Sequence, residues 1–154
     1  MQSLQPSMNS LDHTLVRLCQ LVIQGQKQDS KKYGMVGACV VGPNGEKVGR
    51  LNYALGSNRV HAERAALDAY YEKFGEKPPR GSVIVTTLSP CSADNMIGRY
   101  AQSCTDLINE AGVHKVYAGY QDPTQPDTNR KFNLEITDNP KIQSLCKRFA
   151  DTFL

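Results

Sequence analysis

The chain has 154 residues, of which 40% are hydrophobic and 21% are charged, and its formal net charge of +3 gives no reason to expect a nucleic acid partner. No apolar run approaches the roughly 20 residues of a membrane-spanning helix, and residues 1–10 are polar, so we expect neither a membrane span nor a secretory leader. Five cysteines without dense, regular spacing favour a reducing, cytoplasmic location, where thiols are free, buried or bound to a metal.

The chain is expected to form a single domain over residues 1–154 that begins with a helix. Residues 1–9 are polar and are predicted to be flexible. Apolar residues then recur at helical spacing from Leu11 to Val22, and Ser10 is a candidate N-cap. A polar stretch, "GQKQDSKK", ends this helix.

A β-hairpin and a second helix are predicted next. Met35–Val41 is an apolar, strand-like run, and Glu46–Asn52 returns beside it after a Gly-Pro-Asn-Gly turn. Residues 53–60 are predicted to be a loop. Ala62–Phe74 has helical periodicity, and the Gly75 that follows is typical of a helix end.

The remaining elements complete a layered fold. Ser82–Leu88 is a predicted central strand, His114–Tyr120 and Asn133–Thr137 are further strands, and Lys141–Phe153 is a closing helix. Helices that alternate with buried strands predict an α/β fold with three α/β/α layers and a mixed five-stranded sheet. Only 10 to 12 residues separate the last two strands, which favours an antiparallel fifth strand, because a parallel crossover needs about a dozen residues or more.

Two short motifs carry chemistry. The sequence "VHAERAAL" places His61 and Glu63 two positions apart at a helix start, and "SPCS" places Cys91 just after the central strand. In sheets with helices on both faces, ligands bind outside the carboxyl ends of the strands. We therefore expect His61 and Cys91 to face each other at this edge.

Cys104 has two interpretations. It lies on an apolar helical stripe, where a free cysteine is an ordinary core residue. Thirteen helical steps from Cys91 would cover about 20 Å, whereas two thiolates on one zinc ion lie only about 4 Å apart. If both cysteines bind one metal, the chain must loop out between them, with a helix break at Gly98 or Ser103. Asp94 is the rival ligand, because carboxylates also bind zinc.

His-Ala-Glu at a helix start and Pro-Cys after a central strand resemble the zinc-dependent cytidine deaminase superfamily. The resemblance covers about residues 36–123. The usual P-C-x-x-C signature is incomplete, because Asp94 stands where its second cysteine is expected. The segments "TLSPCS" and "SCTDLINEAGVHKVYAGYQDP" are similar to the riboflavin-biosynthesis pyrimidine deaminases, which also carry an insert between their two cysteines. The similarity favours Cys104 over Asp94 and makes residues 92–103 an insert near the active site.

The resemblance implies a cytidine deaminase-like fold that holds Zn²⁺ through His61, Cys91 and Cys104. An open fourth position would bind a water, which zinc activates to hydroxide for attack on the carbon bearing an amine. Glu63 would be the catalytic proton shuttle. The substrate-binding candidates are Asn52, Ala62 and Ser89.

The implied substrate is an amino-pyrimidine or amino-purine, as a free base, nucleoside or nucleotide, and the implied assembly is a homodimer or homotetramer. Two other functions stay open at this point. One is a deaminase that edits RNA or single-stranded DNA, for which the weak charge gives little support. The other is a non-catalytic binding module that zinc stabilises.

Overall fold

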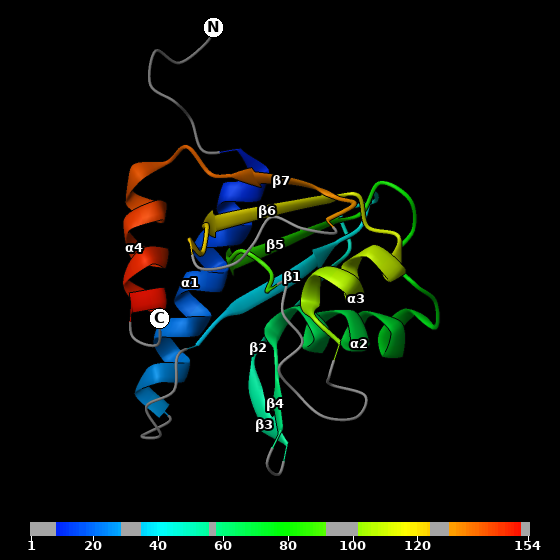
Figure 1. Ribbon diagram of the computed structural model, residues 1–154, viewed down its shortest axis with the longest axis horizontal. Coiled ribbons are helices and arrows are strands. Elements are labelled where there is room, and N and C mark those ends of the chain that lie inside the picture. The colour runs from blue at the N-terminus through cyan, green and yellow to red at the C-terminus, as the bar shows by residue number, and fades with distance from the viewer. Residues whose placement is uncertain (1–8, 29–34, 56–57, 92–101, 124–129, 152–154) are drawn as a thin grey trace, which may run out of the picture.

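In the computed structural model, a five-stranded sheet lies between two pairs of helices, with α1 and α4 on one face and α2 and α3 on the other (Figure 1). The helices are α1 (Ser10–Gln28), α2 (Ala62–Phe74), α3 (Cys104–Ala111) and α4 (Pro140–Asp151). The structure describes residues 9–28, 35–55, 58–91, 102–123 and 130–151. This arrangement confirms the predicted three-layer α/β/α fold with a mixed sheet.

The sheet has the strand order β2-β1-β5-β6-β7. Its strands are β1 (Gly37–Val41), β2 (Lys47–Leu51), β5 (Val83–Leu88), β6 (Lys115–Tyr120) and β7 (Asn133–Ile136). Strand β1 is antiparallel to both β2 and β5, and β5, β6 and β7 are parallel to one another. Three parallel strands therefore have their carboxyl ends at the same edge of the sheet.

The predicted antiparallel direction of the fifth strand is wrong. Strand β7 runs parallel to β6, with Lys115 opposite Asn133 and Ala118 opposite Ile136. Residues 121–132 join the two strands, and this connection is just long enough for a parallel crossover. The prediction failed because the length of a connection near this limit does not decide the strand direction.

Each face of the sheet has its own hydrophobic core, and the central strands supply both. Ile84 and Val116 pack with the apolar residues of α2 and α3, whereas Val85 and Tyr117 pack with those of α1 and α4. Successive side chains of a strand point to opposite faces, so neighbouring residues of β5 and β6 serve different cores. This double burial explains why the central strands are nearly continuous apolar runs.

The predicted loop over residues 53–60 is wrong, because this segment contains a small hairpin. Strands β3 (Tyr53–Leu55) and β4 (Asn58–Val60) pair antiparallel outside the main sheet. Each strand has three residues, which is shorter than the four to eight residues over which strand periodicity can be recognised.

The ends of two helices show how the sequence sets their limits. The predicted N-cap Ser10 is the first residue of α1, and Asn9 is the cap, since its Oδ1 accepts the amide of Asp12 at 2.8 Å. Helix α2 ends at Gly75, which has a φ of 73° and donates its amide to the Tyr71 carbonyl. The other residues of the predicted flexible start lie outside the described residues. Within the described part of the chain, every helix is too short or too polar to cross a membrane.

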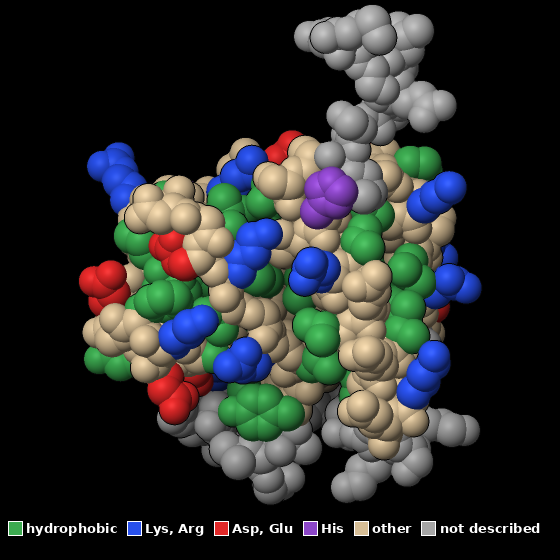
Figure 2. Space-filling view, turned by 180° about the vertical axis from the view of Figure 1, so that it is seen from behind, with side chains coloured by type: hydrophobic (Ala, Val, Ile, Leu, Met, Phe, Trp, Pro, Cys, Tyr) green, Lys and Arg blue, Asp and Glu red, His purple; other side chains and the backbone are tan. Residues whose placement is uncertain are grey.

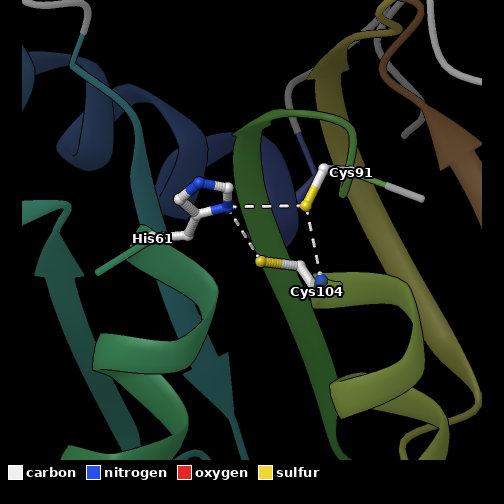
Figure 3. A group of neighbouring side chains, drawn as sticks. All are labelled: His61, Cys91 and Cys104. Atoms are coloured by element: carbon white, nitrogen blue, oxygen red, sulfur yellow. Dashed lines mark hydrogen bonds between the residues drawn. The ribbon is translucent and has the colours of Figure 1, made fainter. Parts of the chain in front are cut away.

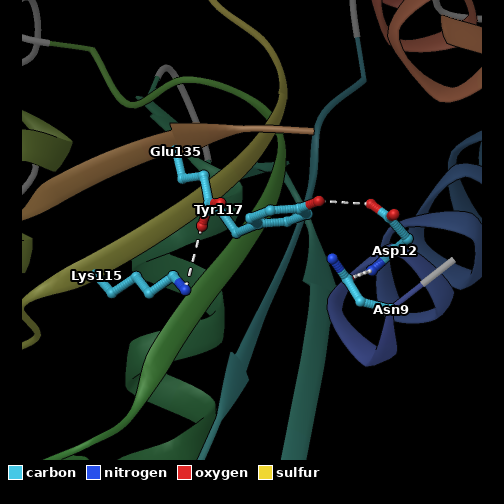
Figure 4. A network of polar contacts seen from close by, with 5 residues as sticks. All are labelled: Asn9, Asp12, Lys115, Tyr117 and Glu135. Carbon is cyan, nitrogen blue, oxygen red and sulfur yellow. Dashed lines mark hydrogen bonds and ion pairs between the residues drawn. The ribbon is translucent and has the colours of Figure 1, made fainter. Parts of the chain in front are cut away.

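A buried polar network joins the start of α1 to the sheet (Figure 4). The hydroxyl groups of Tyr117 and Thr137 each donate to Asp12 Oδ1 at 2.7 Å, and Asp12 is buried. Nearby, Lys115 and Glu135 pair across β6 and β7 at 3.2 Å. The network fixes α1 against β6, which leaves the opposite face of the sheet for α2 and α3.

Candidate metal centre

Three side chains meet at the carboxyl end of β5 (Figure 3). His61 immediately precedes α2, Cys91 follows β5, and Cys104 is the first residue of α3. Their ligand atoms all lie within 4.8 Å of one another. The structure therefore brings together the three residues that the sequence predicts as metal ligands.

The separations of the ligand atoms fit a tetrahedral zinc ion. His61 Nδ1 lies 3.4 Å from Cys91 Sγ and 3.3 Å from Cys104 Sγ. Zinc bonds of about 2.1 Å to nitrogen and about 2.3 Å to sulfur place such atoms about 3.6 Å apart in a tetrahedron. The geometry makes Nδ1 the ligating nitrogen, so the ring proton belongs on Nε2. Among the described residues, this group consists of one histidine and two cysteines.

Cys104 reaches the centre because α3 starts at that residue. Ser103, one of the two predicted break points, is the N-cap of α3, and its Oγ accepts the amide of Asp106 at 3.1 Å. The amide of Cys104 donates to Cys91 Sγ at 3.4 Å, and that of Thr105 donates to the Cys91 carbonyl at 3.0 Å. Two amides at the start of α3 therefore bind Cys91. Residues 92–101 of the predicted insert, with Asp94 and Gly98, lie outside the described residues.

The protein surroundings favour one thiolate even before a metal contributes. Hydrogen bonds from the side chains of Cys104 and His61 lower the pKa of Cys91 to about 5, against the effect of burial. The same interaction with Cys91, together with burial, raises the pKa of Cys104, because its thiol keeps the proton that it donates. A bound divalent cation lowers the pKa of both thiols, since the thiolate is the form that binds metal.

Glu63 lies beside the ligands on the first turn of α2 and is buried, with 4% of its surface exposed. Burial raises the pKa of its carboxyl to about 7, although the nearby His61 opposes this shift. The Cys104 side chain hydrogen-bonds to this carboxyl. A buried carboxyl that gains and loses a proton near neutral pH is suited to acid–base chemistry.

The three predicted substrate-binding residues lie at different places around this edge. Ala62 is fully buried and begins α2 next to His61. Ser89 is buried between β5 and Cys91, and its Oγ accepts the amide of Asp122 at 2.8 Å. Asn52 follows β2, and its Oδ1 accepts the amide of Val36 at 2.9 Å. This hydrogen bond fixes the Asn52 carboxamide to the residue that precedes β1.

Two features of this region were not predicted from the sequence. Asp122 is buried two residues beyond the end of β6, and its amide donates to the hydroxyl of Ser89, the residue that follows the parallel strand β5. The "GYQDP" that follows an apolar run could have signalled it, because carboxyl ends of adjacent parallel strands share an edge. Arg64 Nη2 donates to Gln102 Oε1 at 3.3 Å and so joins α2 to the residue before Ser103. No local pattern relates Arg64 to Gln102.

Comparison with solved structures supports the fold. The structure of a diaminohydroxyphosphoribosylaminopyrimidine deaminase/5-amino-6-(5-phosphoribosylamino)uracil reductase from Thermotoga maritima is 26% identical with a TM-score of 0.61, over 90% of this chain and 40% of that one. RibD from Acinetobacter baumannii is 18% identical with a TM-score of 0.64, over 93% and 39%. A dCMP deaminase from the cyanophage S-TIM5 is 24% identical with a TM-score of 0.56, over 84% and 100%. This chain spans less than half the length of the first two proteins.

The sequence also matches a family pattern that contains the metal ligands. None of the curated proteins matches the chain. The pattern described as the cytidine and deoxycytidylate deaminase zinc-binding region matches residues 9–120, which include His61, Cys91 and Cys104. The match and the His/Cys/Cys geometry both identify Zn²⁺ as the metal. The chain belongs to the cytidine and deoxycytidylate deaminase zinc-binding family.

Proposed function

We propose that this protein is a zinc-dependent hydrolase that removes the amino group of an amino-pyrimidine or amino-purine, supplied as a base, nucleoside or nucleotide. A three-donor metal site beside a buried carboxyl carries the proposal: His61, Cys91 and Cys104 meet within 4.8 Å, and the pKa of the neighbouring Glu63 is about 7. The reaction consumes one water, releases ammonia and leaves a carbonyl group on the ring.

His61, Cys91 and Cys104 would hold the zinc ion as one neutral imidazole and two thiolates. When bound, zinc supplies a Lewis acid that brings the pKa of a coordinated water close to 7. The helix starts at α2 and α3 also contribute, since the partial positive charge of a helix N-terminus stabilises thiolates.

Glu63 would move the protons of the reaction. Its ionised carboxylate accepts a proton from water and donates it to the ring nitrogen next to the carbon under attack. The carboxylate then takes the remaining proton from the hydroxyl group added to the ring carbon and delivers it to the exocyclic nitrogen. The carbon–nitrogen bond breaks, ammonia leaves, and a carbonyl group remains on the ring. A residue that acts first as a base and then as an acid works best with a pKa near the working pH, and burial raises the pKa of Glu63 to about 7.

Three further groups would orient the ring. The amide of Ala62 lies in the first turn of α2, where amides have no partner within the helix. The Ser89 hydroxyl accepts the Asp122 amide and can still donate its own hydrogen. Asn52 is oriented by its bond from the Val36 amide, so its carboxamide is pre-set to contact a sugar or ring substituent.

A small pyrimidine compound is the substrate class that we favour. The Thermotoga maritima structure, 26% identical to this chain, is that of a pyrimidine deaminase joined to a reductase. The face in Figure 2 carries scattered Lys and Arg side chains among hydrophobic and polar groups, without one continuous basic patch. This scattered charge does not support a polymer substrate on that face.

An ammonia-release screen with zinc-loaded protein tests the proposal. The panel contains cytosine, cytidine, deoxycytidylate, guanine, adenosine and a diaminopyrimidine phosphate. We expect turnover of at least one compound and one zinc per chain. Glu63→Gln is expected to lower turnover by about 10²–10⁴-fold with the zinc content unchanged. Glu72→Gln, on the exposed side of the same helix, is the matched control and is expected to keep full activity.

Other outcomes would contradict the proposal. A full zinc content with no turnover of any compound favours a non-catalytic zinc module, and unchanged activity of Glu63→Gln removes the proposed proton shuttle. Tight binding to single-stranded RNA or DNA that weakens steeply with salt favours an editing enzyme. Assembly into a homodimer or homotetramer stays a prediction, which sedimentation analysis tests.

A further inference from the structure

A second pair of cysteines lies on the face of the sheet opposite the metal centre. Cys19 belongs to α1 and Cys146 to α4, and these helices lie side by side in Figure 1. The two sulfur atoms are 3.6 Å apart. Both residues are buried, with 2% and 1% of their surfaces exposed. The metal centre makes no use of this pair.

Gly119 leaves the space that the Cys146 sulfur occupies. A Cβ atom at position 119 of β6 would lie 2.3 Å from Cys146 Sγ and 2.9 Å from its Cβ, which no ordinary packing permits. The bare glycine backbone thus lets α4 bring Cys146 directly onto the sheet, and α1 closes over it with Cys19. The packing directs the two thiols at each other.

The other three cysteines have different environments. The Cys39 thiol points to the backbone carbonyl of Val40 at 3.6 Å and is buried. Cys91 and Cys104 belong to the candidate metal centre, where their sulfurs would bind zinc. Cys19 and Cys146 therefore form the one close dithiol outside the metal centre.

We propose that Cys19 and Cys146 are a modification site for small peroxides, which convert the pair to a disulfide that joins the first and last helices. The two sulfurs, now 3.6 Å apart, must approach to about 2.05 Å to form the bond. The closed loop would contain most of the chain, so the disulfide would restrict the unfolded state and resist unfolding.

The chemistry proceeds in two steps that balance with hydrogen peroxide as the oxidant. The Cys19 sulfur attacks one peroxide oxygen, the O–O bond breaks, and the first water leaves as Cys19 becomes a sulfenic acid. The Cys146 sulfur then attacks the Cys19 sulfur, and its proton leaves with the hydroxyl group as the second water. Two thiols lose two electrons and two hydrogens, and the peroxide gains them. The hydrogen bond from Cys146 lowers the pKa of Cys19, which identifies Cys19 as the first nucleophile.

The burial of Cys19 and Cys146 limits the size of the oxidant that can react with them. Thiols with 1% and 2% of their surfaces exposed are closed to bulky disulfide reagents in the folded protein, so the oxidant must be as small as hydrogen peroxide. We therefore expect oxidised glutathione to leave the pair reduced under conditions in which peroxide oxidises it.

Peptide mapping of zinc-loaded wild-type protein tests the proposal. The protein is treated with hydrogen peroxide, unfolded, alkylated and digested. We expect a cross-linked peptide that contains Cys19 and Cys146, an intact mass lower by about 2 Da before alkylation, and reversal by dithiothreitol. The urea midpoint of the oxidised protein is expected to rise. Cys146→Ser should lose this rise, and Cys39→Ser, which changes a buried cysteine without a thiol partner, should keep it.

The wild-type peptide map decides the question even if Cys146→Ser does not fold. Complete alkylation of Cys19 and Cys146 after peroxide treatment would overturn the proposal. So would a map in which Cys91 and Cys104 are the sole cross-linked pair, because the reactive dithiol would then be that of the metal centre.

Discussion

Cys104 supplies two groups to the metal centre, and a single substitution separates them. Its sulfur lies 3.3 Å from His61 Nδ1, and its amide donates to Cys91 Sγ. Cys104→Ser removes the sulfur and keeps the amide. We expect this variant to lose more than about 100-fold in zinc affinity, because substitutions outside the ligand set already cost 10–100-fold. Competition with a chelator of known affinity measures the loss.

Asp94→Asn is the matched control for this experiment, because Asp94 is the alternative third ligand that the sequence offers. We expect Asp94→Asn to bind zinc as wild type does. If Asp94→Asn loses zinc while Cys104→Ser retains it, the assignment of Cys104 as a ligand is wrong.

At the scale of single residues, some members of the metal centre were predictable from the sequence and others were not. His61 and Cys91 stand next to clear helix and strand patterns, so their meeting follows from the topology. Cys104 did not stand out, because a ligand and a core cysteine can occupy the same apolar face of a helix. The bond from Val36 to Asn52 was not predicted, since it joins two ends of a hairpin whose register is set by the folded sheet.

The buried hydroxyl group of Tyr117 links β6 to the start of α1. Tyr117 donates to Asp12 Oδ1 at 2.7 Å, and Thr137 donates to the same oxygen. Tyr117→Phe leaves the ring in place and deprives a buried carboxylate of one donor. We expect the free energy of unfolding in urea to fall by about 1–3 kcal/mol at neutral pH. Tyr71→Phe, on the exposed side of α2, is the control and is expected to cause no loss.

The same variant should behave differently in alkali. Burial raises the pKa of Tyr117 above its ordinary value of 10.0, so the unfolded chain releases this proton at a lower pH than the folded protein. The contribution of the phenol to stability is complete below pH 10 and falls as the pH rises above it. Phenylalanine has no such proton. The difference in the free energy of unfolding between wild type and Tyr117→Phe should therefore be smaller at about pH 11 than at about pH 8. A gap that stays constant or widens would contradict the assigned shift.

At the scale of elements, local patterns predicted the type of an element better than its pairing. The four helices and five main strands were expected close to their observed positions, because the helices have periodic apolar faces and the central strands are short apolar runs. The direction of β7 was predicted wrongly, since it depends on hydrogen bonds to β6 that no local pattern specifies. The β3–β4 hairpin was missed because three-residue strands carry too little periodicity.

At the scale of the whole molecule, the metal centre joins three segments of one face. His61 anchors the start of α2, Cys91 the end of β5 and Cys104 the start of α3. The core beneath α1 and α4 is built from different side chains and contains none of these ligands. Zinc is therefore expected to stabilise one face much more than the other.

Amide hydrogen exchange before and after removal of zinc with a chelator measures this asymmetry. A ligand at about 100 times its dissociation constant stabilises a fold by about 2.7 kcal/mol. When the ligand is removed, we expect the free energy of local opening to fall first in the segments that the ligand joins. We expect faster exchange at the start of α3, where the amides of Cys104 and Thr105 bond to Cys91, and little change in α1 and α4. In Cys104→Ser, the chelator should have no further effect. Equal acceleration on both faces would show that zinc supports the entire fold, and no acceleration at α3 would show that these amide bonds form without the metal.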